Sequence, residues 1–251
     1  MNFETRDEGF VSTQPPSGST AVVCGPRTAL TRNGAIVCNY QTQTGLSLND
    51  FKPTVSRSVD DGKTWRYQGL MWPHLATKYS IFGSVSRGLE GELLFFGNRT
   101  PIDEPGESFW SDATQGIKQN ELVWASSRDD GRAWTEPQPF PMPIPGAAES
   151  PGAMCATRDG GWICCYAPYN TFDPKTVVDR SQIVFMRSDD RGKSWSSNAM
   201  MRFDEVDSGG AEAWVIELAD GRLLGTCWHL DLKDEQEYEN AYALSSDGGN
   251  S

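Results

Sequence analysis

The sequence predicts an all-β protein made of repeated four-stranded antiparallel sheets, and three observations lead to this prediction. The 251 residues include 25 glycines and 15 prolines, which interrupt the chain too often for long helices. Between these residues lie short apolar or alternating runs that are typical of strands. A turn-like octapeptide also recurs at a spacing of roughly 60 residues, the length of one small sheet with its loops.

The octapeptide has the pattern Ser-x-Asp-x-Gly-x-x-Trp. Three complete copies and the beginning of a fourth occupy residues 58–65, 127–134, 188–195 and 245–251. In such a turn the Asp carboxylate can accept backbone N–H groups, the Gly can adopt a positive φ, and the Trp can pack against the sheet. We therefore interpret the octapeptide as a structural turn that indicates the architecture without locating the chemistry.

Each octapeptide follows a strand, and a hairpin precedes that strand. The hairpin turns contain Gly after Asn, Glu or Asp, and the Asn and Asp pairs predict two-residue type I′ turns most strongly. These pairs are Asn33-Gly34, Glu90-Gly91, Asp159-Gly160 and Asp220-Gly221. The repeating unit of strand, tight turn, strand, loop, strand, octapeptide and strand is typical of a β-propeller blade. It divides the chain into blades at about residues 20–75, 76–145, 146–207 and 208–251.

Charge and hydropathy argue against several classes of function. Acidic residues outnumber basic ones by 34 to 22, and the net charge of -12 repels phosphate backbones, so we expect no nucleic-acid partner. No apolar run approaches the roughly 20 residues of a membrane span. The polar, acidic start lacks the pattern of a secretory signal, which predicts a cytoplasmic protein or one whose leader is missing.

Histidine and cysteine usage predicts neither a metal site nor a cofactor. The two histidines and six cysteines lack zinc-type spacing. We expect the cysteines to be small buried thiols, with Cys164 and Cys165 on opposite faces of one strand. One alternative stays open, a disulfide between Cys155 and Cys164 if Asp159-Gly160 forms a two-residue turn.

The octapeptides resemble the Asp-boxes, also called BNR repeats, of the sialidase (neuraminidase) superfamily. This resemblance implies a six-bladed propeller with a glycan pocket at the centre of one face, of which this chain holds about four blades. A cut within the fourth Asp-box would leave an open propeller with an unpaired edge, which predicts self-association. Sialidases hold the sugar carboxylate with three arginines and use an Asp acid/base, so the resemblance implies these groups here. It also implies a Tyr nucleophile partnered by a Glu, with the Tyr beyond residue 251.

In a propeller the inner strands start at one rim, so the residues before them converge around the axis. Arg27, Glu149 and Glu212 are expected in this ring. Arg27 lies in a degraded version of the family's Arg-Ile-Pro segment, which implies bidentate binding of a carboxylate. The segment 212–224 resembles the family segment with the catalytic Glu, which implies that Glu212 polarises the nucleophilic Tyr. Glu149 is expected to contact the substrate as the second acid of the ring.

Four further site residues depend on the family pattern. Asp50 is the only carboxylate in the loop where the family has its acid/base, although it lies closer to the octapeptide than that pattern requires. Asn240 stands where the family has a carboxylate-binding Arg, so a neutral or differently charged sugar is an alternative. Arg99 could partly replace that Arg, and His229 could contact such a sugar.

Three functions follow from these observations, and each has a glycan as the partner. The preferred one is an exo-acting glycoside hydrolase of the sialidase type that removes terminal sialic acid or a related sugar, supported by Arg27 together with Glu212. The second is another glycan-active propeller enzyme, a glycosidase or lyase for neutral sugars or uronic acids, which accounts better for Asn240. The third is a propeller that binds glycans without turnover.

Overall fold

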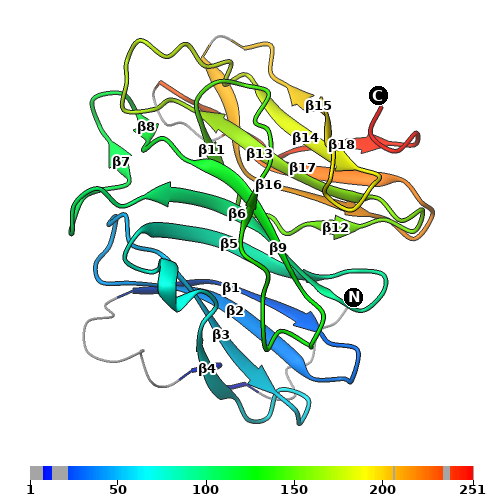
Figure 1. The fold of residues 1–251 in the computed structure, drawn as a ribbon. Coiled ribbons are helices and arrows are strands. Elements are labelled where there is room, and N and C mark those ends of the chain that lie inside the picture. The colour runs from blue at the N-terminus through cyan, green and yellow to red at the C-terminus, as the bar shows by residue number, and fades with distance from the viewer. Residues whose placement is uncertain (1–7, 13–21, 206, 234–237, 251) are drawn as a thin grey trace.

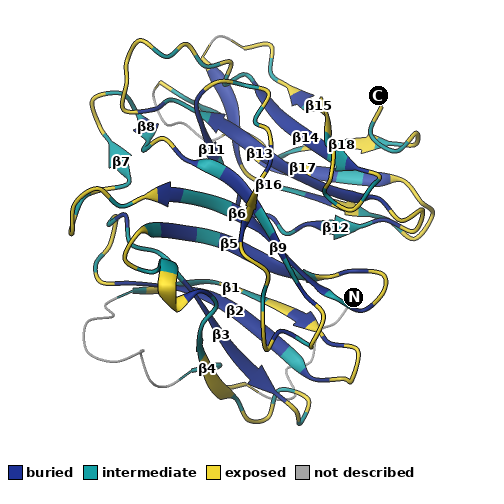
Figure 2. Cartoon of the chain, in the orientation of Figure 1, coloured by how far each residue is buried: buried dark blue, intermediate teal, exposed yellow. Residues whose placement is uncertain are grey.

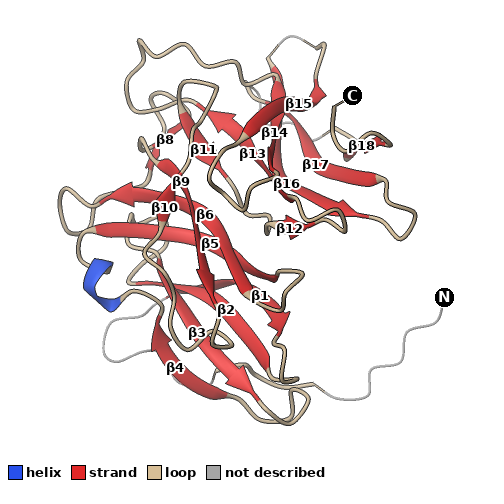
Figure 3. Ribbon diagram, turned by 45° about the vertical axis from the view of Figure 1, so that its right-hand side comes forward, coloured by secondary structure: helices blue, strands red, loops and turns tan. Residues whose placement is uncertain are grey.

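The computed structural model describes residues 8–12, 22–205, 207–233 and 238–250. Its strands form four consecutive antiparallel sheets arranged like the blades of a propeller (Figure 1). This arrangement confirms the predicted all-β propeller fold. Helix within these residues is limited to η1 (Pro73–Leu75), drawn in blue in Figure 3. The described helical structure is thus too short to cross a membrane.

Strands that are neighbours in a sheet follow the order of the chain. Sheet 1 contains β1 (Val22–Leu30), β2 (Ile36–Gln43), β3 (Lys52–Ser58) and β4 (Arg66–Leu70). Sheet 2 contains β5 (Tyr79–Arg87), β6 (Leu93–Pro101), β9 (Glu121–Ser127) and β10 (Gln138–Pro139). Sheet 3 contains β11 (Ala147–Glu149), β12 (Cys155–Ala156), β13 (Trp162–Tyr169), β14 (Gln182–Ser188) and β15 (Ser196–Arg202), with β11 and β12 both paired to β13. Sheet 4 contains β16 (Ser208–Glu217), β17 (Leu223–Asp231) and β18 (Ala241–Ser245), and a small hairpin of β7 (Trp110–Ser111) and β8 (Gly116–Ile117) extends from sheet 2.

The hydrophobic core consists of three layers, one between each pair of consecutive sheets. Successive side chains of a central strand point to opposite layers. Phe95 packs between sheets 1 and 2 and Phe96 between sheets 2 and 3, and both are fully buried. Cys164 and Cys165 divide in the same way between the two layers that flank sheet 3, as predicted. The central strands β2, β6 and β13 of sheets 1 to 3 are therefore largely buried on both faces, whereas β17 of sheet 4 alternates between buried and more exposed residues. The outer strands β4, β15 and β18 carry many exposed residues (Figure 2).

The hairpin turns are one residue longer than the sequence predicts. In the first, the Thr31 N–H donates to the Ala35 carbonyl at 2.8 Å and the Gly34 N–H donates to the Thr31 carbonyl at 3.2 Å. Gly34 has a φ of 87°, but Asn33 does not have the positive φ that a type I′ turn requires. The same two hydrogen bonds recur in residues 88–92, 157–161 and 218–222.

The longer turn also changes the register that would permit a disulfide in sheet 3. Cys155 lies opposite Ile163, one residue away from the predicted partner Cys164. All six cysteines are free thiols.

Each octapeptide closes on itself through its Ser and Asp side chains. In the first copy the Ser58 hydroxyl donates to the Asp60 carboxylate at 2.8 Å, and the Thr64 N–H donates to the same carboxylate at 2.9 Å. The Gly62 N–H donates to the Ser58 hydroxyl at 2.9 Å, and Gly62 has a φ of 88°. Hydrogen bonds from Thr64 and Ser58 lower the pKa of Asp60 to about 2. The Ser–Asp and Gly–Ser bonds recur in the other three copies, so the turn is a structural unit.

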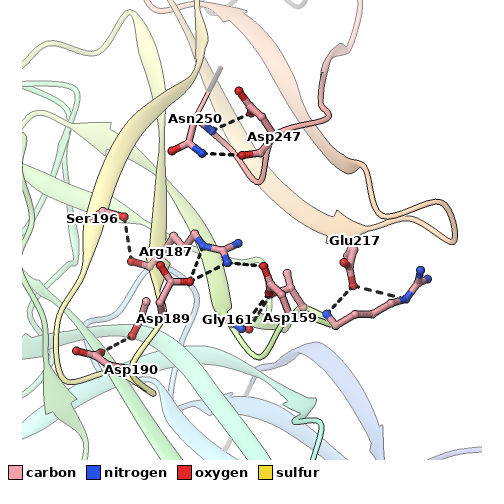
Figure 4. Close-up of polar contacts among 12 residues, drawn as sticks. Asp159, Gly161, Arg187, Asp189, Asp190, Ser196, Glu217, Asp247 and Asn250 are labelled. Atoms are coloured by element: carbon pink, nitrogen blue, oxygen red, sulfur yellow. Dashed lines mark hydrogen bonds and ion pairs between the residues drawn. The ribbon is translucent and has the colours of Figure 1, made fainter.

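Arg187 connects the third octapeptide to the hairpin turn of its own sheet (Figure 4). Its guanidinium lies 2.7 Å from the carboxylates of both Asp159 and Asp189, and its side chain is only 16% exposed. In the fourth octapeptide the Asn250 N–H donates to the Asp247 carboxylate at 3.0 Å. Octapeptides and hairpin turns thus occupy one end of the sheets, which leaves the longer loops at the other end.

Candidate active site

A cavity of about 240 Å³ opens at the loop end of the sheets. Sites for drug-sized ligands run from roughly 300 to 1,000 Å³, so this cavity suits a smaller molecule. Sheets 1 and 2 and their loops supply aromatic and uncharged polar side chains, and sheets 3 and 4 supply two glutamates. The lining residues are Asn49, Phe51, Ser80, Phe82, Asn98, Thr100, Phe109, Ile117, Asn120, Ala148, Glu149, Ser150 and Glu212.

Three phenylalanines form one wall of the cavity. The Phe51 ring meets the Phe82 ring edge-on at a centroid distance of 5.2 Å and lies 5.5 Å from the Phe109 ring. Phe82 comes from β5, whereas Phe51 and Phe109 come from loops of sheets 1 and 2. Small-molecule sites are usually lined by apolar and aromatic surface together with a few polar groups at fixed positions.

The polar lining also positions the inner edge of sheet 3. The Asn120 amide donates to the Ala148 carbonyl at 2.9 Å and accepts from the Ala148 N–H at 2.8 Å. Asn98 donates to the Ser150 hydroxyl at 3.2 Å. These bonds attach β11 to sheet 2 on both sides of Glu149, which fixes the backbone that carries this carboxyl group.

The loop between β6 and β9, residues 102–120, closes one side of the cavity. The Glu107 carboxylate accepts hydrogen bonds from Asn49 and Lys118, both at 2.7 Å. Although burial raises the pKa of Glu107, the hydrogen bonds from Lys118 and Asn49 bring it below its ordinary value. The Asn49 N–H also donates to the Glu107 carbonyl at 2.8 Å. The loop that carries Phe109 is therefore tied to sheet 1.

Glu149 and Glu212 form a carboxyl pair at the junction of sheets 3 and 4. The Glu212 N–H donates to a carboxyl oxygen of Glu149 at 3.2 Å. Burial, together with the negative charge of Glu212, raises the pKa of Glu149 to about 8. A carboxyl group with this pKa holds its proton at neutral pH and can act as a general acid.

The backbone at Glu212 is bulged and adopts an uncommon conformation. The pairing of β16 with β17 shifts register between Ala211 and Trp214, and Glu212 has a φ of 51°. A left-handed backbone is rare for residues other than Gly. β1 has a similar bulge, and there the residue with positive φ is Gly25. Sheet 4 thus carries a Glu at a position that favours Gly, and such backbone strain concentrates at functional sites.

Tyr169 at the end of β13 adjoins the carboxyl pair. Burial, followed by the charges of Glu149 and Glu212, raises the pKa of its hydroxyl well above the ordinary value. Tyr169 therefore stays protonated at neutral pH. The guanidinium of Arg180 lies over the Tyr169 ring, 5.5 Å from its centroid.

The structure brings Glu149 and Glu212 together in the cavity but leaves Arg27 and Asp50 out of its lining. The Arg27 guanidinium lies over the Trp214 ring at 4.9 Å, close to the bulge of sheet 4. The Asp50 carboxylate accepts hydrogen bonds from the backbone N–H of Thr44, at 3.2 Å, and from its hydroxyl. The neighbouring Asn49, rather than Asp50, lines the cavity.

Arg99, His229 and Asn240 also lie outside this cavity. Arg99 points away from it because Asn98 and Thr100 occupy the facing positions of β6, and its Nε donates to Glu121 at 2.9 Å. His229 stacks on the Phe203 ring and contacts the Tyr238 ring at a tilt, and its Nε2 lies 3.2 Å from the Ser208 hydroxyl. Asn240 is exposed just before β18.

Sequence reasoning missed the three phenylalanines of the cavity wall, the pair of hydrogen bonds between Asn120 and Ala148, and Tyr169. Alternation along β5 and β6 could have indicated Phe82 and Asn98, because each lies two residues from another lining residue. Phe109 and Asn120 lie in a loop without a recognisable motif, so no local signal marks them.

Comparison with known proteins agrees with the all-β propeller architecture. No family model matches the sequence. A curated sialidase from Bacteroides fragilis (strain YCH46) is 23% identical over a 218-residue alignment, and the match covers 78% of this chain and 36% of that protein. Among solved structures, a Hadza microbial sialidase superposes with a TM-score of 0.70 at 19% identity, covering 93% of this chain and 46% of the other. The fold is that of a sialidase-type β-propeller.

The same type of fold also occurs in a solved structure of an arabinanase. The α-L-arabinanase of Penicillium chrysogenum, complexed with arabinobiose, superposes with a TM-score of 0.62 at 19% identity, covering 90% of this chain and 63% of the other. The chain spans about a third of the curated sialidase and about half of the Hadza structure.

Proposed function

We propose that this protein is an exo-acting glycoside hydrolase that removes terminal sialic acid or a related sugar from glycans. The observation that carries the proposal is the Glu149–Glu212 carboxyl pair, in which one acid is held protonated beside a small aromatic cavity. The similarity to a named sialidase supports the same class of reaction. A cavity of this size favours a single terminal sugar over the middle of a polymer.

The proposed reaction uses the two carboxyl groups in different protonation states. Glu149 donates its proton to the glycosidic oxygen as the bond between that oxygen and the anomeric carbon breaks. The carboxylate of Glu212 stabilises the positive charge that develops on the sugar. A water oxygen then bonds to the anomeric carbon and its proton returns to the carboxyl pair, which regenerates the starting state.

A glycosidase for a neutral sugar is the second candidate, and the charge of the cavity favours it. Among the described residues that line the cavity, none is Arg or Lys. The Glu212 carboxylate would repel an acidic group placed next to it. The likeness to an arabinanase fold is consistent with this alternative.

Hydrolysis of fluorogenic glycosides tests the proposal and separates the two candidates. The substrates are a sialoside, an α-L-arabinofuranoside and a glucuronide, assayed with the wild type and Glu212→Gln. We expect turnover of the sialoside, lowered about 100-fold or more in Glu212→Gln because transition-state charge stabilisation is lost. The exposed Glu104→Gln serves as the matched control and should retain full activity.

The substrate pattern decides between the alternatives. Turnover of the arabinofuranoside alone would replace the first candidate by the second. Absence of turnover on all three substrates by protein with an intact β-sheet circular dichroism spectrum would contradict both.

A further inference from the structure

Two more cavities lie between sheet 4 and the loop 170–181 that follows β13. The larger has a volume of about 600 Å³ and the smaller about 230 Å³, and both are lined by Gln115, Arg180 and Leu232. The hairpin of β7 and β8 reaches this region, where Gly116 pairs with Asn170 (Figure 1). Three sheets thus contribute to a second recess at the loop end.

Arg180 is a half-buried cation without a carboxylate partner among the described residues. Its Nε is buried and makes no hydrogen bond within that part of the chain. Asp179 lies next to it in sequence, but the Asp179 carboxylate accepts a hydrogen bond from Ser181 at 2.7 Å and contacts Arg202 at 3.4 Å. Asp207 attracts Arg180 from the wall of the larger cavity without forming an ion pair. A guanidinium withdrawn from water loses hydration that an anionic ligand would replace.

Three aromatic side chains, those of Trp110, Tyr169 and Trp228, line the smaller cavity together with Arg180. The centroids of the Trp110 and Tyr169 rings lie 6.3 Å apart, and the Arg180 guanidinium lies over the face of the Tyr169 ring. Trp228 lines the same cavity and is 49% exposed. Exposed indole surface next to a cation provides an apolar face and a charge for one ligand.

We propose that Arg180, Trp110 and Trp228 form a subsite that binds an acidic sugar unit. Arg180 holds the anionic group, a carboxylate or a sulfate ester, through bidentate hydrogen bonds, and an indole face packs against the sugar ring. Tyr169 lines the same cavity and also interacts electrostatically with Glu149 and Glu212, which places the subsite near the carboxyl pair. The inference rests on the proposed function only in that the ligand is a glycan.

Titration calorimetry tests the subsite independently of turnover when it is performed in the Glu212→Gln background. The probes are 3′-sialyllactose for a carboxylate, galactose 6-sulfate for a sulfate ester, and lactose as the neutral reference. We expect saturable binding of at least one acidic probe and none of lactose. Arg180→Gln should weaken that binding about tenfold or more, because a charge-assisted bidentate contact is removed.

Three companion variants sharpen this test. Arg222→Gln removes the same charge from the distant β16–β17 turn and should leave binding unchanged. Arg180→Lys keeps the charge without the planar fork and should give an intermediate affinity. Asp207→Asn removes one of the negative charges that line the two cavities, the others being Asp179 and Asp231, and should strengthen binding of the acidic probe.

Each failure has a distinct meaning. The subsite is excluded if lactose binds as tightly as the acidic probes, if Arg180→Gln binds as tightly as its parent, or if folded protein binds neither acidic probe. Acidic-sugar binding that depends on Arg180 in a protein that hydrolyses no glycoside would uphold the subsite and contradict the proposed hydrolase.

Discussion

Replacing Glu149 by Gln should lower kcat for glycoside hydrolysis by roughly 10²–10⁴-fold, the usual contribution of a general acid. The amide keeps the size of the side chain and can still accept the Glu212 N–H bond, but it cannot donate a proton to the leaving oxygen. KM should change much less than kcat, because the sugar still meets the same cavity walls. The measurement is steady-state kinetics on whichever glycoside the wild type hydrolyses.

The choice of leaving group strengthens this test of Glu149. A glycoside whose leaving group departs without protonation, such as a dinitrophenyl glycoside, should restore much of the rate in Glu149→Gln. Glu212→Gln should remain slow on the same substrate, because its defect is loss of charge stabilisation. A kcat for Glu149→Gln within threefold of the wild type on natural-type leaving groups would exclude Glu149 as the proton donor.

Phe96→Ala should lower the free energy of unfolding by about 3–5 kcal/mol, the range for removing a buried aromatic ring. Phe96 is fully buried between sheets 2 and 3, where its ring lies 5.7 Å from the Phe140 ring. Urea denaturation followed by tryptophan fluorescence measures the change.

The matched control for this core truncation is Leu89→Ala in an exposed turn. Leu89 is 56% exposed, so its truncation should change the free energy of unfolding by less than about 0.5 kcal/mol. Equal destabilisation by the two variants would contradict the assignment of the core to the layers between the sheets.

The fold was predictable because its signals are local and repeated. The Ser-x-Asp-x-Gly-x-x-Trp turn depends on hydrogen bonds within eight residues, so Ser58 and Asp60 identify it without tertiary information. Apolar runs such as Leu93 to Phe96 indicate strands covered on both faces. The exact turn type was not predictable, because a Gly at positive φ fits both two-residue and three-residue hairpins.

The candidate site was predictable only where the repeat itself positions a residue. Glu149 and Glu212 both lie on the first strands of their sheets, and the propeller geometry therefore brings them together. Asp50 was expected because the family resemblance implies an acid/base in its loop, but the loop turns back so that its carboxylate binds Thr44. Phe109 and Arg180 come from long loops whose paths depend on contacts between sheets, which no local pattern encodes.

The raised pKa of Glu149 makes the protein less stable as the pH rises. Its folded-state pKa of about 8 lies above the ordinary value of 4.5. The contribution of protonated Glu149 to the free energy of unfolding is fully present below pH 4.5 and is lost as the pH rises through about 8. The reason is that the unfolded chain releases this proton at a lower pH than the folded protein does. Glu149→Gln removes this pH dependence. Its free energy of unfolding should therefore rise relative to that of the wild type between pH 4.5 and about pH 8.

Direct titration of the Glu149 carboxyl group tests the central claim that this acid is protonated at neutral pH beside Glu212. The measurement is a carbon-13 NMR titration of glutamate carboxyl resonances, with the Glu149 signal assigned by its loss in Glu149→Gln. We predict that this signal titrates at about pH 8 in the wild type and at a lower pH in Glu212→Gln, where the facing charge is absent. Titration of Glu149 near its ordinary pKa of 4.5 in both proteins would contradict the account.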